Sequence, residues 1–162
     1  MFPDDVLAQA KDVMQKAVLG KNMIAVAESC TGGLVSGALT AVEGSSAVFD
    51  CGFTTYSYKA KSSLLGVPQG MLVEHGAVSE KVAELMAEGA LAASSADTAV
   101  AVTGIAGPGG GTNEKPVGLV CFAVARIGYK TQTHECCFPN DGRANVRMNS
   151  VRQALSMLAT SM

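Results

Sequence analysis

Apolar and polar residues follow two different spacings along this chain, and together these spacings predict helices interleaved with strands. Apolar residues at helical spacing predict helices over 4–19, 31–41, 59–65, 79–94 and 141–158. Short apolar or β-branched runs predict strands over 23–27, 48–56, 98–103, 117–126 and 131–138. The stretches 67–70 and 75–77 are predicted connectors, and residues 127–130 are the predicted turn of a late hairpin.

The order of these elements predicts an α/β fold. Helices alternate with strands in the first part of the chain, and a hairpin follows, which is typical of a single-domain three-layer α/β/α sandwich with a mixed sheet. No linker, repeat or low-complexity stretch interrupts residues 1–162, so we expect one domain. Small residues on the helix over 79–94 indicate close packing, either within the chain or as a contact surface in a larger complex.

Composition and charge exclude several classes of protein. The 162 residues carry 12 Lys+Arg against 14 Asp+Glu, and 48% of them are hydrophobic. This balance is unlike that of disordered chains and lacks the basic footprint of nucleic-acid binding proteins. No apolar run approaches the ~20 residues of a membrane helix, and the acidic start does not resemble a secretory signal. We therefore expect a cytoplasmic protein with no nucleic-acid or membrane partner.

The five cysteines and two histidines do not form a recognisable metal or disulfide pattern. No CxxC occurs, and neither histidine has a ligand-type spacing to a cysteine. We expect no metal, no cofactor and no disulfide, with most cysteines acting as small buried apolar residues.

The first candidate for chemistry is AESCTGG at 27–33, which follows a predicted strand and opens a predicted helix. Ser29 at such a turn would expose its hydroxyl as a nucleophile does. The helix N-terminus with Thr31, Gly32 and Gly33 would let an anionic ligand approach the backbone. The alternative is that Ser29 or Thr31 only caps the helix.

The second candidate is TYSYKAK at 55–61, because a serine nucleophile needs a base and a lysine with a lowered pKa can be one. Either Lys59 or Lys61 could take this role, with Tyr56 sharing the proton network. The alternative is that both lysines lie in solvent on an exposed helix face.

Two further stretches suggest a binding site for an anion. The glycine-rich segment 103–118, with Gly104 and Gly107, could fold its N–H groups around a ligand, and Lys115 could add a cation. The alternative is a flexible surface lid. Arg143 lies in the first turn of the last helix, where a cation opposes the helix dipole, so it could bind an anion. The alternative is a solvated arginine that could pair with Asp141.

Taken together, these stretches resemble the CinA C-terminal domain family, known as competence/damage-inducible, over about residues 5 to 160. The motifs that carry the resemblance are AESCTGG (27–33), EGSS (43–46), GFTTYSYKAK (52–61), HGAVSE (75–80), VTGIAGPGGG (102–111), EKPVG (114–118) and GRANVR (142–147). The resemblance implies an amidohydrolase of the pyridine nucleotide cycle. Such an enzyme deamidates nicotinamide mononucleotide to nicotinic acid mononucleotide and ammonia, and it self-associates as a homo-oligomer.

The resemblance also implies roles for individual residues. The family's nucleophile falls on Ser29, its lysine base on Lys61 and its active-site tyrosine on Tyr56. Positions that contact the nucleotide fall on Thr103 and Arg143, and the GSS turn near the site falls on Ser45 and Ser46.

A non-catalytic nucleotide-binding or regulatory module remains the alternative function. Such a module would not need Ser29 Oγ and Lys61 Nζ to lie within hydrogen-bond distance, so that distance separates the two hypotheses.

Overall fold

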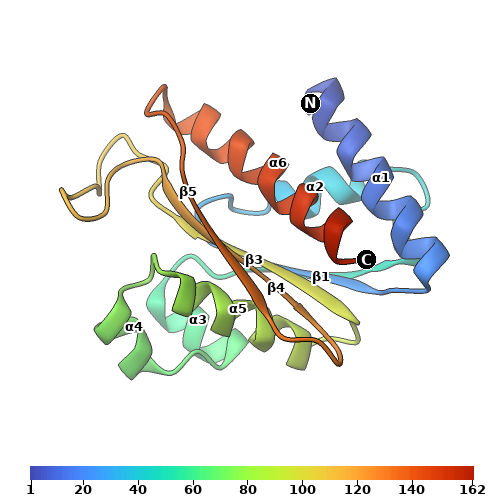
Figure 1. The fold of residues 1–162 in the computed structure, drawn as a ribbon, viewed down its shortest axis with the longest axis horizontal. Coiled ribbons are helices and arrows are strands. Elements are labelled where there is room, and N and C mark those ends of the chain that lie inside the picture. The colour runs from blue at the N-terminus through green and yellow to red at the C-terminus, as the bar shows by residue number, and fades with distance from the viewer.

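A five-stranded mixed sheet forms the centre of the computed structural model, which describes all 162 residues (Figure 1). Its strand order is β2-β1-β3-β4-β5. The parallel strands are β1 (Ile24–Glu28), β2 (Phe49–Thr54) and β3 (Thr98–Gly104). The hairpin strands β4 (Leu119–Arg126) and β5 (Gln132–Cys137) continue the sheet in antiparallel fashion.

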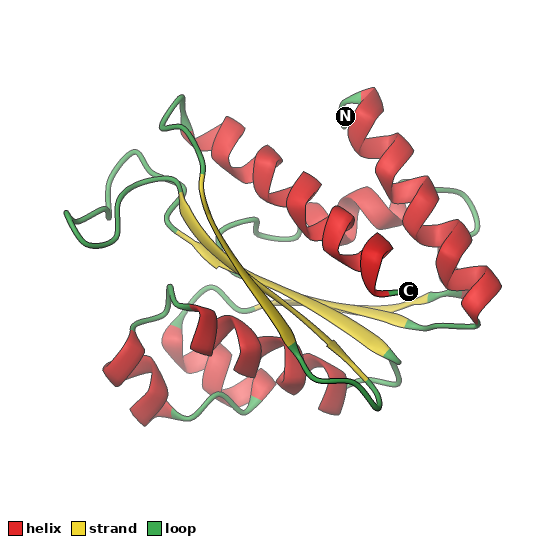
Figure 2. Ribbon diagram, viewed as in Figure 1, coloured by secondary structure: helices red, strands yellow, loops and turns green.

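Helices cover both faces of the sheet, which confirms the predicted three-layer α/β/α sandwich (Figure 2). One face carries α1 (Asp4–Gly20), α2 (Leu34–Thr40) and α6 (Arg143–Ser161). The other face carries α3 (Tyr58–Leu65), α4 (Gln69–His75) and α5 (Glu80–Ala92). A single 3₁₀ turn, η1 (Ser45–Ala47), precedes β2. None of the helices combines the length and the apolar character needed to cross a bilayer.

The two faces of the sheet differ in side-chain size, and this difference sets how closely each helical layer packs. Large residues such as Val100 and Phe122 join the core formed with α1, α2 and α6. Alanines such as Ala99 and Ala123 join the core formed with α5. Because successive side chains of a strand point to opposite faces, the alternation of Ala with Val along these strands produces both surfaces.

The small residues of α5 are used inside the chain. Ala83, Ala87 and Ala90 are fully buried against the alanine face of the sheet. A Cβ placed on Gly89 would overlap the carbonyl oxygen of Leu65 at the end of α3. The small-residue surface predicted for this helix therefore packs against the sheet and α3.

Three expectations about local structure were wrong. Helix α2 begins at Leu34 and not at Thr31, because Gly32 and Gly33 adopt left-handed φ angles of 61° and 96°. Helix α4 (Gln69–His75) overlaps both predicted connectors, 67–70 and 75–77, where no helix was expected. Only Leu72 of its seven residues is buried, so its apolar residues show no helical periodicity. Of the five free cysteines only Cys30 and Cys121 are buried, contrary to the expectation that most of them are.

Candidate active site

The carboxyl ends of the parallel strands bring the predicted site segments together. Ser29 follows β1, Thr55 follows β2, and Thr103 is the penultimate residue of β3. The chain leaves β1 toward α2 on one face and leaves β2 toward α3 on the other (Figure 1). Ligands of α/β sheets bind at the carboxyl ends of the strands, next to the point where the strand order reverses, which here lies between β1 and β3.

Ser29 and Lys61 form a direct side-chain contact at this divergence. Lys61 Nζ lies 2.9 Å from Ser29 Oγ and donates a second hydrogen bond, of 2.7 Å, to the carbonyl oxygen of Thr55. Helix α3 starts after Ser57, whose Oγ accepts from the N–H of Ala60, and this start places Lys61 on the buried side of the helix. Lys59 is exposed. Of the two lysines that the residue pattern left open, Lys61, to which the resemblance assigns the role of base, is therefore the one that reaches Ser29.

The surroundings of Lys61 favour its neutral form. Its side chain is only 1% exposed, and no carboxylate forms an ion pair with it. Burial lowers the pKa of Lys61 from 10.5 to about 8, because the charged ammonium loses its hydration. Roughly a tenth of the molecules then carry a neutral Lys61 at pH 7, which is the form that accepts a proton from serine.

Glu28, the last residue of β1, caps helix α2. Its buried carboxylate accepts hydrogen bonds from the N–H groups of Gly33, Val35 and Ser36 and from the Ser36 hydroxyl. Neither Ser29 nor Thr31 caps the helix, contrary to the alternative considered for them. The Glu28 carboxylate therefore occupies the N–H groups at the start of α2, including that of Gly33, where the sequence suggested an anionic ligand.

Arg147 on α6 holds the turn that carries Ser29. Its Nε donates to the carbonyl oxygen of Cys30 at 3.1 Å, and its Nη2 donates to that of Thr31 at 2.8 Å. Sequence reasoning singled out Arg143 and missed Arg147. The spacing of four residues, which places both arginines on one face of α6, was the signal that could have indicated it.

Arg143 connects three segments that are distant in the sequence. It is the first residue of α6, and it donates to the carbonyl oxygen of Gly107 at 2.8 Å and to the hydroxyl of Tyr56 at 2.9 Å. It does not pair with Asp141. Tyr56 is 60% exposed, and its hydroxyl bonds to Arg143 and to neither Ser29 nor Lys61.

Thr103 and Lys115 both bind the connector between α4 and α5. Thr103 Oγ1 donates to Ala77 O at 2.7 Å. Lys115 Nζ donates to His75 O and to Val78 O, each at 2.7 Å. Two of the residues expected to contact a ligand thus fasten this connector to the end of β3 and to the glycine-rich loop.

The glycine-rich loop starts at a close approach between two strands. A Cβ on Gly104 would lie 2.7 Å from Val120 Cγ2, and one on Gly107 would lie 2.6 Å from Val117 Cγ1. Gly107 also has a left-handed φ of 78°. These two glycines are therefore required by the packing of the loop, whatever ligand it binds.

Ser45 and Ser46 lie at the other end of the sheet. They form η1 directly before β2, whose first residue, Phe49, pairs with the first residue of β1, Ile24. A parallel βαβ unit returns the chain to the amino ends of the strands, so one strand length of about 15 Å separates this turn from Ser29. The chain itself does not bring these two serines to the Ser29–Lys61 pair, contrary to the expectation.

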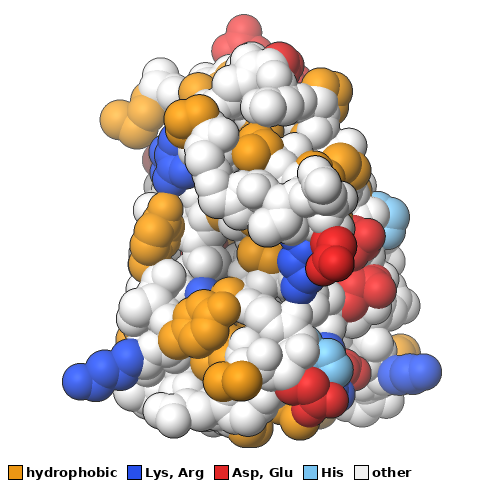
Figure 3. Space-filling view, turned by 90° about the vertical axis from the view of Figure 1, so that its left-hand side faces the viewer, with side chains coloured by type: hydrophobic (Ala, Val, Ile, Leu, Met, Phe, Trp, Pro, Cys, Tyr) orange, Lys and Arg blue, Asp and Glu red, His pale blue; other side chains and the backbone are white.

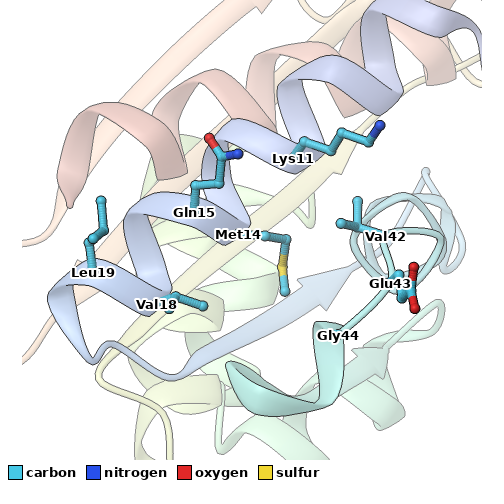
Figure 4. Close-up of a pocket in the computed structure, with 8 residues that line it drawn as sticks. All are labelled: Lys11, Met14, Gln15, Val18, Leu19, Val42, Glu43 and Gly44. Atoms are coloured by element: carbon cyan, nitrogen blue, oxygen red, sulfur yellow. The ribbon is translucent and has the colours of Figure 1, made fainter.

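An apolar hollow also lies at the amino ends of the strands, between α1 and the turn before η1 (Figure 4). Its volume is about 560 Å³, and its lining consists of Lys11, Met14, Gln15, Val18, Leu19, Val42, Glu43 and Gly44. It contains no nucleophile–base pair. No group of three His, Cys, Asp or Glu side chains lies close enough to hold a metal ion. The carboxyl end of the sheet is thus the candidate active site.

The face of the molecule at this end is mostly uncharged. Figure 3 views it from the side where the glycine-rich loop projects in Figure 1. Lys and Arg side chains appear there as separate groups and not as a continuous basic patch.

Comparison with known proteins places the chain in a family. The family model described as the CinA C-terminal domain matches residues 7–162. The chain belongs to the CinA C-terminal domain family. The resemblance drawn from the motifs is thereby confirmed.

Solved structures and curated sequences agree with this family. A competence/damage inducible protein from Agrobacterium tumefaciens matches with a TM-score of 0.97 and 48% identity, over 99% of this chain and 97% of that one. A CinA superfamily protein from Escherichia coli matches with a TM-score of 0.92 and 35% identity, over 100% and 94% of the two chains. A CinA-like protein from Akkermansia muciniphila is 49% identical over 94% of this chain but only 38% of its own length.

The chain thus spans well under half of the length of the curated relatives that it matches. The names of these relatives and of the solved structures state a family and no reaction.

Proposed function

We propose that this CinA-family protein is an amidohydrolase that converts nicotinamide mononucleotide and water into nicotinic acid mononucleotide and ammonia. The observation that carries the proposal is the 2.9 Å contact between Ser29 Oγ and a buried Lys61 with no carboxylate partner. A serine beside a neutral lysine is a nucleophile beside its base, and this pair suits acyl transfer from an amide.

The chemistry proceeds through an acyl-enzyme. Neutral Lys61 takes the hydroxyl proton of Ser29 as Oγ attacks the carboxamide carbon, and the carbonyl oxygen becomes an oxyanion. The ammonium of Lys61 then protonates the amide nitrogen, the C–N bond breaks, and ammonia leaves. Water next attacks the ester carbon and gives one proton to Lys61, which returns a proton to Oγ as the carboxylic acid leaves; the acid then loses its own proton to solvent and becomes the carboxylate.

The uncharged surroundings of Arg143 favour a substrate that carries a phosphate. Its two partners, Gly107 O and the Tyr56 hydroxyl, are uncharged, so no carboxylate of the chain neutralises its guanidinium. Arg143 is exposed, which allows its fork of N–H donors to turn toward an anion. The Lys115 ammonium, already bonded to two carbonyl oxygens, is the less available cation.

The test is ammonia release from nicotinamide mononucleotide by the wild type and by Ser29→Ala, Lys61→Ala and Lys59→Ala. Lys59→Ala is the matched control, because Lys59 lies on the same helix but is exposed. We expect the first two variants to lose at least about 1,000-fold in kcat and the control to keep wild-type activity.

Two outcomes would contradict the proposal. Full activity in a folded Ser29→Ala variant would remove Ser29 as the nucleophile. No ammonia from a folded wild type would favour the non-catalytic nucleotide-binding or regulatory module, and nucleotide affinity without turnover would then support that function.

A further inference from the structure

Two peptide N–H groups next to Ser29 have no hydrogen-bond acceptor within the chain. Ser29 N–H donates to Val102 O and Gly32 N–H donates to Ser29 O, but neither the Cys30 N–H nor the Thr31 N–H donates to any backbone or side-chain oxygen. Both residues are buried, with exposures of 5% for Cys30 and 0% for Thr31. Buried backbone donors without a partner are rare, and those that occur call for a functional explanation.

Arg147 determines how the Thr31 N–H points. The only cis peptide bond in the chain is Gly107–Pro108, so the bond between Cys30 and Thr31 is trans. In a trans peptide the C=O and the following N–H point in opposite directions. Because Arg147 Nε binds Cys30 O, the Thr31 N–H points away from Arg147.

The turn is held at both ends by opposite charges. The Arg147 guanidinium binds the carbonyl oxygens of Cys30 and Thr31, and the Glu28 carboxylate binds the N–H of Gly33. Arg147 and Glu28 thus bind the groups on either side, and the N–H groups of Cys30 and Thr31 stay free.

We propose that the Cys30 and Thr31 N–H groups donate to the oxyanion formed during attack by Ser29, and that Arg147 is a positioning residue that orients the Thr31 donor. This inference rests on the proposed amidohydrolase function. Arg147 acts through the peptide that it binds and does not contact the reacting atoms. Preorganised donors of this kind stabilise the transition state more than the bound substrate.

The first measurement compares kcat and KM for Arg147→Met and Arg152→Met with nicotinamide mononucleotide. Arg152 is the matched control, since it lies on the same helix and pairs with Asp5 at the surface. We expect Arg147→Met to lower kcat by roughly 10- to 100-fold, somewhat less than the loss of an oxyanion donor itself, with KM changed by less than about threefold. Arg152→Met should match the wild type.

The second measurement does not depend on the substrate. A fluorophosphonate labels a nucleophilic serine: Oγ bonds to phosphorus, fluoride leaves, and the serine proton passes to Lys61. The phosphoryl oxygen then takes the place of the oxyanion. Intact mass followed over time should show Ser29 labelling slowed in Arg147→Met, by about the same factor as kcat, and unchanged in Arg152→Met.

Arg147→Lys keeps the inference testable if Arg147→Met does not fold. An ammonium can bind two carbonyl oxygens, as Lys115 does in this protein, so this variant should recover part of the labelling rate. A kcat and a labelling rate within threefold of wild type in a folded Arg147→Met would overturn the inference. If the wild type releases no ammonia but Ser29 labelling still depends on Arg147, the proposed substrate fails and the positioning role stands.

Discussion

Lys61 is the residue whose environment defines the candidate chemistry. Its ammonium is buried, and a serine hydroxyl and one carbonyl oxygen replace the water that would hydrate it. This exchange is unfavourable for the charge, and it is the reason that the pKa of Lys61 is lowered to about 8. Lys59, on the same helix, is exposed and makes no contact with Ser29.

The lowered pKa of Lys61 predicts the pH dependence of the reaction. The base must be neutral, so kcat/KM should rise about tenfold from pH 7 to pH 9, with a midpoint at about 8. Initial rates of ammonia release across this range measure the profile. Lys61→Arg should be inactive throughout, because arginine stays charged. A flat profile in the wild type, or recovery of Lys61→Arg at high pH, would exclude Lys61 as the base.

At the scale of elements, helix α5 approaches the sheet and α3 more closely than an ordinary helix could. Alanines on both surfaces allow the short distance to the sheet, and Gly89 allows the contact with the end of α3. Because α3 carries Lys61 and β1 leads into Ser29, this packing helps to set the distance between the two side chains.

Substitution by alanine should have opposite effects on stability at Gly89 in α5 and at Gly70 in α4. Gly89→Ala would push a Cβ into the backbone of Leu65, and we expect it to lower the free energy of unfolding by about 2 kcal/mol or more. Gly70→Ala, in exposed α4 with nothing within 4 Å of the new Cβ, should raise it by about 0.5–1 kcal/mol. Thermal unfolding of both variants gives the comparison. An unchanged Tm for Gly89→Ala would show that α5 can move away from α3 at no cost.

At the scale of the whole molecule, Arg143 ties together the start of α6, the glycine-rich loop and the turn after β2. Its partners Gly107 and Tyr56 are 36 and 87 residues away in the sequence. Residues 108–114 of the loop are all exposed, so this contact is a main restraint between the loop and the helical layer.

We expect removal of this restraint to loosen the loop and to weaken binding of the proposed nucleotide substrate. Arg143→Met should increase the rate of limited proteolysis within 108–114 and raise KM for the mononucleotide, by roughly tenfold, through loss of a charged contact. Tyr56→Phe keeps the bond to Gly107 O and should be cleaved at the wild-type rate. Equal cleavage of wild type and Arg143→Met would place the restraint elsewhere.

Hydrophobic periodicity, glycines and family motifs were sufficient to predict the sandwich, the mixed sheet and most helices. These features act over a few residues, so the sequence displays them directly. The capping of α2 by Glu28, the contact between Lys61 and Ser29 and the hydrogen bonds from Arg147 to the turn after β1 were decided only by tertiary structure. Each depends on strands and helices far apart in the chain meeting at one end of the sheet. The same topology separates Ser45 and Ser46 from Ser29, because parallel strands require the chain to return to their amino ends.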